Sequence, residues 1–132
     1  MKSILYSAVI LAACSPARGG EMRVTITTPA AESSVVERQI IEGTVSDGSA
    51  TVWVIVHPLE VSEYWVQPRV TVRENGSWKV QAFIGRTGSI DVGKLFEIRV
   101  FANPGVALRE GLALNQWPSA AATSDVIEVS RK

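Results

Sequence analysis

The feature that most constrains the fold is a two-residue alternation of apolar and polar side chains, which recurs in short runs from Arg23 onward. Val24 and Ile26, for example, alternate with polar neighbours. Successive side chains on a β-strand point to opposite faces, so this period is typical of strands that bury one face. Turn-forming residues separate the runs, as in Ser46-Asp47-Gly48-Ser49, where we expect Gly48 to adopt a positive φ. The sequence therefore predicts an all-β chain.

About seven short strands follow from this pattern. The predicted ranges are residues 23–27, 39–45, 51–56, 65–72, 77–82, 95–101 and 126–129. Pro68 interrupts the fourth range and predicts an edge strand or two short pieces, because proline cannot donate to a strand ladder. Asn75-Gly76 between alternating runs predicts a hairpin. Residues Ala107 to Leu114 have helical spacing and predict a short helical turn before the last strand.

This density of short strands predicts one antiparallel β-sandwich, with a small barrel as the alternative. A chain of 132 residues fits a single domain. Its 13 basic and 13 acidic residues cancel to a formal net charge of zero, which argues against nucleic acid as a partner. The single cysteine, Cys14, excludes an intramolecular disulfide and a paired-cysteine zinc or redox site.

The amino-terminal segment has the layout of a secretion signal. One positive charge at Lys2 precedes an apolar run from Ile4 to Ala13, and small residues stand directly before Cys14. The run is roughly half of the ~20 residues that a helix needs to cross a bilayer, so a transmembrane anchor is disfavoured. We therefore expect a signal peptide at residues 1–13, a tether at residues 14–22 and a domain at residues 23–132.

Leu11-Ala12-Ala13-Cys14 resembles the lipobox of bacterial lipoproteins. The resemblance implies that the Cys14 thiol receives a diacylglyceryl group, that the signal is cut before this cysteine, and that the new amino terminus is acylated. The signal is short for that family. Several acyl chains hold a protein stably at a membrane. The resemblance thus implies a lipid-anchored, extracytoplasmic protein of the cell membrane or outer membrane. Ser15 resembles the residue that permits outer-membrane sorting, and the choice of membrane stays open.

The body of the chain resembles bacterial immunoglobulin-like domains. In these domains an opening strand ends in proline, a glycine-containing strand follows, and a Gly-x-Trp hairpin precedes a strand that crosses the core. The segments that carry the likeness are Ile26 to Pro29, Ile41 to Val45, Val52 to Pro58, Tyr64-Trp65, Asn75 to Trp78 and Phe96 to Val100. The likeness implies an Ig-like or fibronectin-like sandwich, without the disulfide of antibody domains.

Candidate catalytic and metal-binding groups are sparse. His57 is the single histidine, and no Gly-x-Ser-x-Gly elbow accompanies it, so we expect a strand-end histidine bonded to backbone and no enzymatic activity. The carboxylates Asp47, Glu60, Glu63 and Asp91 lack the spacing of a calcium loop, and we expect them to be solvated loop charges. We therefore expect no catalytic residue, no metal site and no cofactor beyond the lipid on Cys14.

Aromatic residues offer the candidate binding site. Trp78 lies in an alternating run and is expected in the core. Tyr64 and Trp65 follow a polar segment, and with His57 and Gln67 they could form an aromatic and polar shelf for a sugar ring or a protein partner. The alternative is that these residues only cap one end of the sandwich.

The sequence favours a noncatalytic binding or scaffolding module of the cell envelope, whose partner is an envelope protein or a polysaccharide. A carbohydrate-binding module that uses Tyr64 and Trp65 is the second hypothesis. An envelope enzyme assembled from dispersed carboxylates and His57 is the third, and a purely structural lipoprotein is the fourth.

Overall fold

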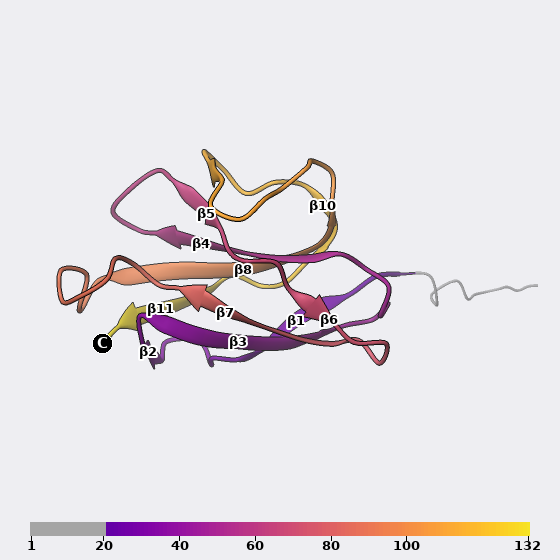
Figure 1. Ribbon diagram of the computed structural model, residues 1–132, viewed down its shortest axis with the longest axis horizontal. Helices are drawn as coiled ribbons and strands as arrows, with labels where there is room; N and C mark the ends of the chain where they lie inside the picture. The colour runs from indigo at the N-terminus through magenta and orange to yellow at the C-terminus, as the bar shows by residue number, and fades with distance from the viewer. Residues whose placement is uncertain (1–20) are drawn as a thin grey trace, which may run out of the picture.

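The computed structural model describes residues 21–132, which form two β-sheets packed face to face (Figure 1). Cys14 and the predicted signal peptide lie outside the described residues. The strands are β1 (Val24–Thr28), β2 (Ser34–Val35), β3 (Arg38–Val45), β4 (Val52–Pro58), β5 (Tyr64–Val66), β6 (Thr71–Val72), β7 (Ser77–Phe83), β8 (Leu95–Pro104), β9 (Ala113–Leu114), β10 (Ala120–Thr123) and β11 (Ile127–Arg131). The predicted all-β sandwich is confirmed.

The order of the strands is that of an immunoglobulin-type sandwich. One sheet runs β1-β3-β7-β6, and the other runs β2-β11-β8-β4-β5-β9, with β10 beside the far end of β8. The pairs are antiparallel except for β2, which runs parallel to β11. If β2 and β5 are left out of the count, β1, β3, β7 and β6 are the first, second, fifth and fourth strands, and in the immunoglobulin fold these four share one sheet. The start of β1 and the carboxyl terminus lie toward opposite ends of the sandwich (Figure 1).

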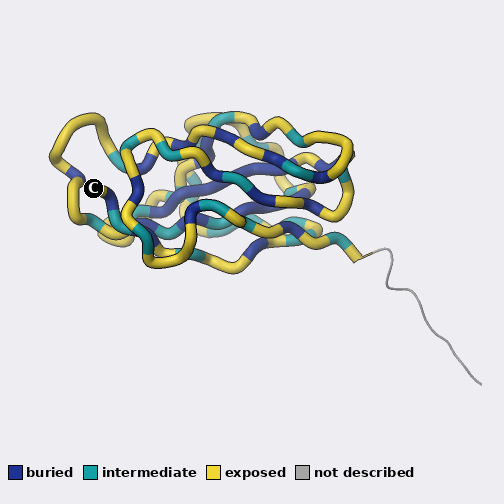
Figure 2. The backbone as a smooth tube through the Cα atoms, turned by 90° about the horizontal axis from the view of Figure 1, so that it is seen from below, coloured by how far each residue is buried: buried dark blue, intermediate teal, exposed yellow. Residues whose placement is uncertain are grey.

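The main core fills the space between the two sheets, where the burial-coloured tube of Figure 2 is dark along the central strands. Trp78 is 3% exposed and packs there, as predicted. Its indole crosses directly over Gly43, where a Cβ would lie 2.4 Å from Trp78 Cζ2 and 1.9 Å from the Thr25 carbonyl oxygen. The absence of a side chain at Gly43 on β3 thus leaves room for the Trp78 ring.

A second apolar cluster lies on the outer face of the β2-β11-β8-β4-β5-β9 sheet. Its buried part consists of Trp53, Ile55, Val66 and Phe101, and the partly buried Tyr64 and Trp117 pack against them. This cluster explains why six consecutive residues of β4, from Val52 to His57, are buried. One face of the strand meets the main core, and the other lies under the segment that links β8 to β10.

Two local predictions differ from the structure. Residues 107–114 form a turn and the short strand β9, and no helix occurs among residues 21–132, so the predicted helical turn is wrong. These residues pair with β5 instead, because Val66 exchanges backbone bonds with Gly111 and Leu112. Gly48 does not have a positive φ; its Cβ would lie 2.1 Å from the Glu74 carbonyl oxygen, so close approach of backbone explains this glycine.

Pro68 marks the point where the chain changes sheets. The predicted strand from Trp65 to Val72 is two short pieces, β5 in one sheet and β6 in the other. The Asn75-Gly76 hairpin is confirmed between β6 and β7, with Gly76 at φ 89°. β5 and β6 therefore belong to different layers, on the side of the sandwich where the chain passes from one sheet to the other.

Candidate functional site

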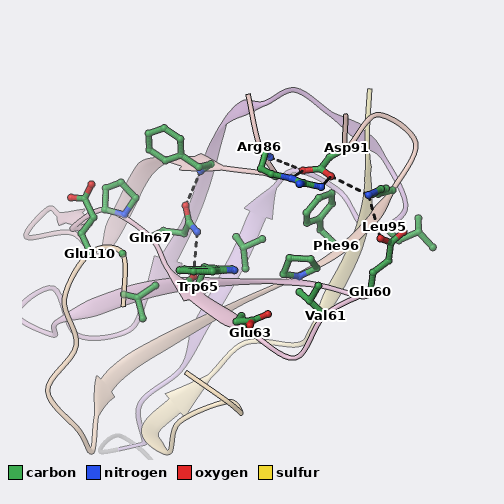
Figure 3. Close-up of a pocket in the computed structure, with 18 residues that line it drawn as sticks. Glu60, Val61, Glu63, Trp65, Gln67, Arg86, Asp91, Leu95, Phe96 and Glu110 are labelled. Carbon is green, nitrogen blue, oxygen red and sulfur yellow. Dashed lines mark hydrogen bonds and ion pairs between the residues drawn. The ribbon is translucent and has the colours of Figure 1, made fainter. Parts of the chain in front are cut away.

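A pocket of about 560 Å³ occupies this side of the sandwich (Figure 3). Its walls come from three parts of the chain: the end of β4 through β5 to Pro68, the end of β7 through the start of β8, and the loop at Glu110-Gly111. These segments are far apart in the sequence, and the sheet switch at Pro68 brings them together. Concave sites of this size are the usual places where small molecules or inserted side chains bind.

Large apolar side chains stand half-exposed around the pocket. Val61 is 44% exposed, Trp65 41%, and Phe83 and Leu95 each 43%. Trp65 faces the pocket because the side chains of β5 alternate, so that Val66 points into the second apolar cluster and Trp65 points away from it. Exposed apolar side chains that converge on one concavity are typical of binding sites.

Gln67 forms the back of the pocket beside Trp65 (Figure 3). It is 4% exposed, and its amide links the two sheets: Nε2 donates to the Trp65 carbonyl at 3.2 Å, and the backbone N–H of Phe83 donates to Oε1 at 2.7 Å. A buried amide with both ends engaged is held in one orientation. Gln67 therefore sets the distance between Trp65 and Phe83 across the pocket.

A network of charged residues closes one end of the pocket. Asp91 accepts three bonds from Arg86: from the backbone N–H at 2.7 Å, from Nε at 3.1 Å and from Nη2 at 2.8 Å. Lys94 Nζ lies 3.3 Å from Asp91 Oδ1 and 3.3 Å from Glu60 Oε1. The Arg86 side chain and backbone hold the pKa of Asp91 well below its usual range, against the opposing effect of burial. Hydrogen bonds to Glu60 and Asp91 raise the pKa of Lys94.

Arg131 supports the charged end of the pocket through hydrogen bonds to the connection between β7 and β8. Its guanidinium donates to the carbonyls of Ile84 at 2.8 Å and Arg86 at 2.9 Å, and also to that of Gly88. The side chain is 3% exposed, and Glu37 Oε1 lies 3.5 Å from Nη2. A buried arginine with several carbonyl partners fixes the loop that those carbonyls belong to. The last strand thus determines where Arg86 stands.

Two further carboxylates, Glu63 and Glu110, line the pocket and lie on either side of Trp65 in the view of Figure 3. Within residues 21–132, neither makes an ion pair. Glu110 reaches the pocket because the Gly111 N–H donates to the Val66 carbonyl at 2.9 Å, which ties the loop to β5.

The structure divides the predicted aromatic shelf. Trp65 and Gln67 line the pocket, whereas His57 and Tyr64 lie on the other face of the sheet, in or beside the second apolar cluster. The rings of His57 and Tyr64 stack with centroids 3.9 Å apart, and Trp117 lies edge-on to Tyr64 at 4.7 Å. The prediction that the four residues form one surface is therefore wrong, because adjacent residues on a strand face opposite ways.

His57 has the structural surroundings that the sequence predicted. It is 9% exposed, Nε2 lies 2.8 Å from the Val61 carbonyl, and Nδ1 lies 3.0 Å from Glu97 Oε1. The backbone contact was predicted, and the pairing with Glu97 across β4 and β8 was not. Both nitrogens are occupied, so His57 holds the β4 to β5 connection in place.

Sequence reasoning correctly placed Asp47 in an exposed turn, where Ser49 donates to its carboxylate. It was wrong for Asp91, which is 5% exposed and ion-paired. Nothing local marked Arg86, Lys94, Glu110 or Arg131 as neighbours of one pocket. The signal that could have drawn attention to Asp91 is its position between Arg86 and Lys94 in a glycine-rich connection.

These features define a class: a β-sandwich of immunoglobulin-type strand order with a lateral, partly apolar pocket. Comparisons of the chain with family models, with curated proteins and with solved structures found no match. In the described part of the chain, no group of three or more His, Cys, Asp and Glu side chains is placed to hold a metal ion. Residues 21–132 also include no helix with the length and apolarity that a membrane crossing requires.

Proposed function

We propose that this chain is a noncatalytic binding module of the bacterial cell envelope, which captures an envelope component in the pocket beside Trp65. The observation that carries the proposal is the pocket of about 560 Å³ with half-exposed Val61, Trp65, Phe83 and Leu95 around it. A domain that served only as a spacer would have no need to expose several apolar side chains in one concavity. Such exposure reduces solubility. The ion-paired and hydrogen-bonded surroundings of the pocket support a preformed site.

The location of the protein is part of the same proposal. We propose that Cys14 carries the lipid anchor and that residues 15–22 tether the domain to the outer side of a membrane. The described chain begins near β1, whereas the charged end of the pocket lies by the carboxyl-terminal strand, toward the opposite end of the sandwich (Figure 1). A tether that enters by β1 would leave that end of the pocket directed away from the membrane.

Site-specific photo-crosslinking in cells tests the binding role. A photoreactive residue at Val61, 44% exposed in the pocket wall, is compared with one at Val106, 51% exposed and outside the pocket. We expect a discrete adduct from position 61 that is absent from position 106 and is lost when Trp65→Ala is added. Equal labelling at both positions, or labelling that ignores Trp65→Ala, would contradict a binding site in this pocket.

A carbohydrate ligand is a second candidate, favoured by the half-exposed indole of Trp65 in the pocket wall. Sugar rings stack on such aromatic faces. In a titration with host glycans, Trp65→Ala would abolish binding, whereas Val106→Ala would serve as the surface control. Binding that survives Trp65→Ala would exclude this mode.

A further inference from the structure

We infer that the pocket recognises a positively charged group on an apolar stem, and specifically the lysine or arginine side chain of a peptide partner. The inference rests on the proposed binding function and names the class of its ligand. It comes from the balance of charge around the pocket, which differs from the zero net charge of the whole chain.

The charges at one end of the pocket already cancel. Arg86 is paired with Asp91, and Lys94 is shared between Asp91 and Glu60 at 3.3 Å from each. Two bases thus face two acids, and an incoming ion of either sign would have to compete with bonds that are already made. This end closes the pocket and offers little net attraction.

The end beside Trp65 is different. Glu63 and Glu110 both line the pocket, and no base among residues 21–132 pairs with either. Counted over the residues that line the pocket, four acids against two bases leave an excess of two negative charges. Two like charges at one concavity attract a cation and repel an anion.

The neighbouring apolar surface suits the stem of a basic side chain. Trp65 is 41% exposed in the pocket wall, and within the described residues no arginine or lysine covers its ring. The face of an indole attracts ammonium and guanidinium groups more strongly than any other aromatic side chain. Val61 and Phe83 add apolar wall for the methylene groups of lysine or arginine.

Nuclear magnetic resonance titration of the full chain in micelles of a neutral detergent tests this inference. The probes are Nα-acetyl-lysine methylamide, its Nε-acetylated form and the corresponding blocked glutamate, and the readout is the indole N–H signal of Trp65. We expect the lysine probe to bind about tenfold more tightly than the Nε-acetylated probe, since a cation–π contact and two carboxylates favour the charge. The glutamate probe should bind most weakly.

Matched variants locate the charge effect. Glu63→Gln and Glu110→Gln should each weaken lysine binding by about threefold, the size expected for a partly exposed ion pair, and leave the Nε-acetylated probe unchanged. Glu74→Gln, on the exposed turn between β6 and β7, is the control and should change neither. Equal affinity for the charged and neutral probes, preference for glutamate, indifference to both pocket variants, or no shift of the Trp65 signal would each overturn the inference.

The two proposals fail in distinguishable ways. A Trp65-dependent crosslink at Val61 without any preference for lysine would support the binding module and contradict the cationic ligand. Selective binding of the lysine probe in the titration, without a crosslink in cells, would support a cation-binding pocket and contradict the envelope partner.

Discussion

Asp91 is the residue whose surroundings differ most from what its place in a loop would predict. Three donors of Arg86 and the ammonium group of Lys94 surround its carboxylate. The charged form is stabilised in the folded state, and the pKa of Asp91 is lowered accordingly. The link between this residue and the shape of the pocket is direct, because Arg86 and Lys94 both line it.

Acid should weaken the fold through Asp91. A carboxyl whose pKa is lower when folded stabilises the protein fully above its unfolded pKa of about 3.9, and this contribution declines as the pH falls from that value through the lower folded pKa. We expect Asp91→Asn to lower the melting temperature by a few degrees at pH 7, with the difference from the parent chain shrinking below about pH 4. Thermal unfolding followed by circular dichroism over pH 3 to 7 measures this. A difference independent of pH would show that the charge of Asp91 does not stabilise the fold.

Gly43 is a second residue with a decisive role, because Trp78 occupies the space above it. A methyl group at position 43 would overlap both the indole and the Thr25 carbonyl oxygen. We expect Gly43→Ala to reduce the free energy of unfolding by about 1–3 kcal/mol or more, as overpacked cores do. Urea denaturation measures the loss. Gly93→Ala, where a Cβ would meet no atom within 4 Å, is the comparison and should be less destabilising despite its φ of 88°.

At the scale of elements, the switch from β5 to β6 creates the pocket. The chain leaves one sheet after Val66 and joins the other at Thr71, and Gln67 bridges the two layers at that point. The amide of Gln67 ties the two sheets together there, because it spans from the Trp65 carbonyl to the Phe83 N–H. The pocket is therefore a consequence of strand order.

Removal of the Gln67 bridge should loosen this side of the sandwich. Gln67→Leu keeps much of the side-chain volume but leaves the partly buried Phe83 N–H without its partner, at a cost of about 1 kcal/mol. We expect faster amide hydrogen exchange at Phe83 together with the loss of stability. Gln81→Leu, on the exposed face of β7, is the matched control and should leave exchange at Phe83 unchanged. Equal exchange in both variants would mean that the bridge is not what holds Phe83.

At the scale of the whole molecule, one sheet separates two apolar clusters. The main core joins the two sheets, and the second cluster joins the outer face of one sheet to the segment between β8 and β10. The second cluster has fewer buried members, and several of its residues are only partly buried. Smaller clusters under long loops open at lower free energy than the main core.

The two clusters should therefore respond differently to truncation of a tryptophan. Trp117→Ala should cost about 1.5–3 kcal/mol, because that side chain is only partly buried, and should raise hydrogen exchange mainly in the segment from Gly105 to Ser119. Trp78→Ala should cost about 3–5 kcal/mol and raise exchange in both sheets. Native-state hydrogen exchange resolves the two patterns. Uniform exchange in Trp117→Ala would show that the two clusters unfold as one unit.

Much of the fold could be predicted from the sequence because strand pleating is a local property. Alternation placed β1, β3, β7 and β8 close to their observed bounds, and Asn75-Gly76 located the hairpin. The short strands β2, β9 and β10 were not predicted, because strands of two to four residues carry almost no periodicity. For the same reason residues 107–114 resembled a helix, and only pairing with β5 gave them an extended form.

The candidate site shows where local reasoning ends. The sequence by itself marked Trp65 and Gln67, but it joined them to His57 and Tyr64, which the pleat of the strands turns to the opposite face. The tertiary structure alone decided that Glu110 and Trp65 line one pocket and that Arg131 fixes the loop of Arg86. These contacts join segments tens of residues apart. Periodicity determines which face a residue occupies within its own strand, whereas the pairing of distant strands determines which residues share a pocket.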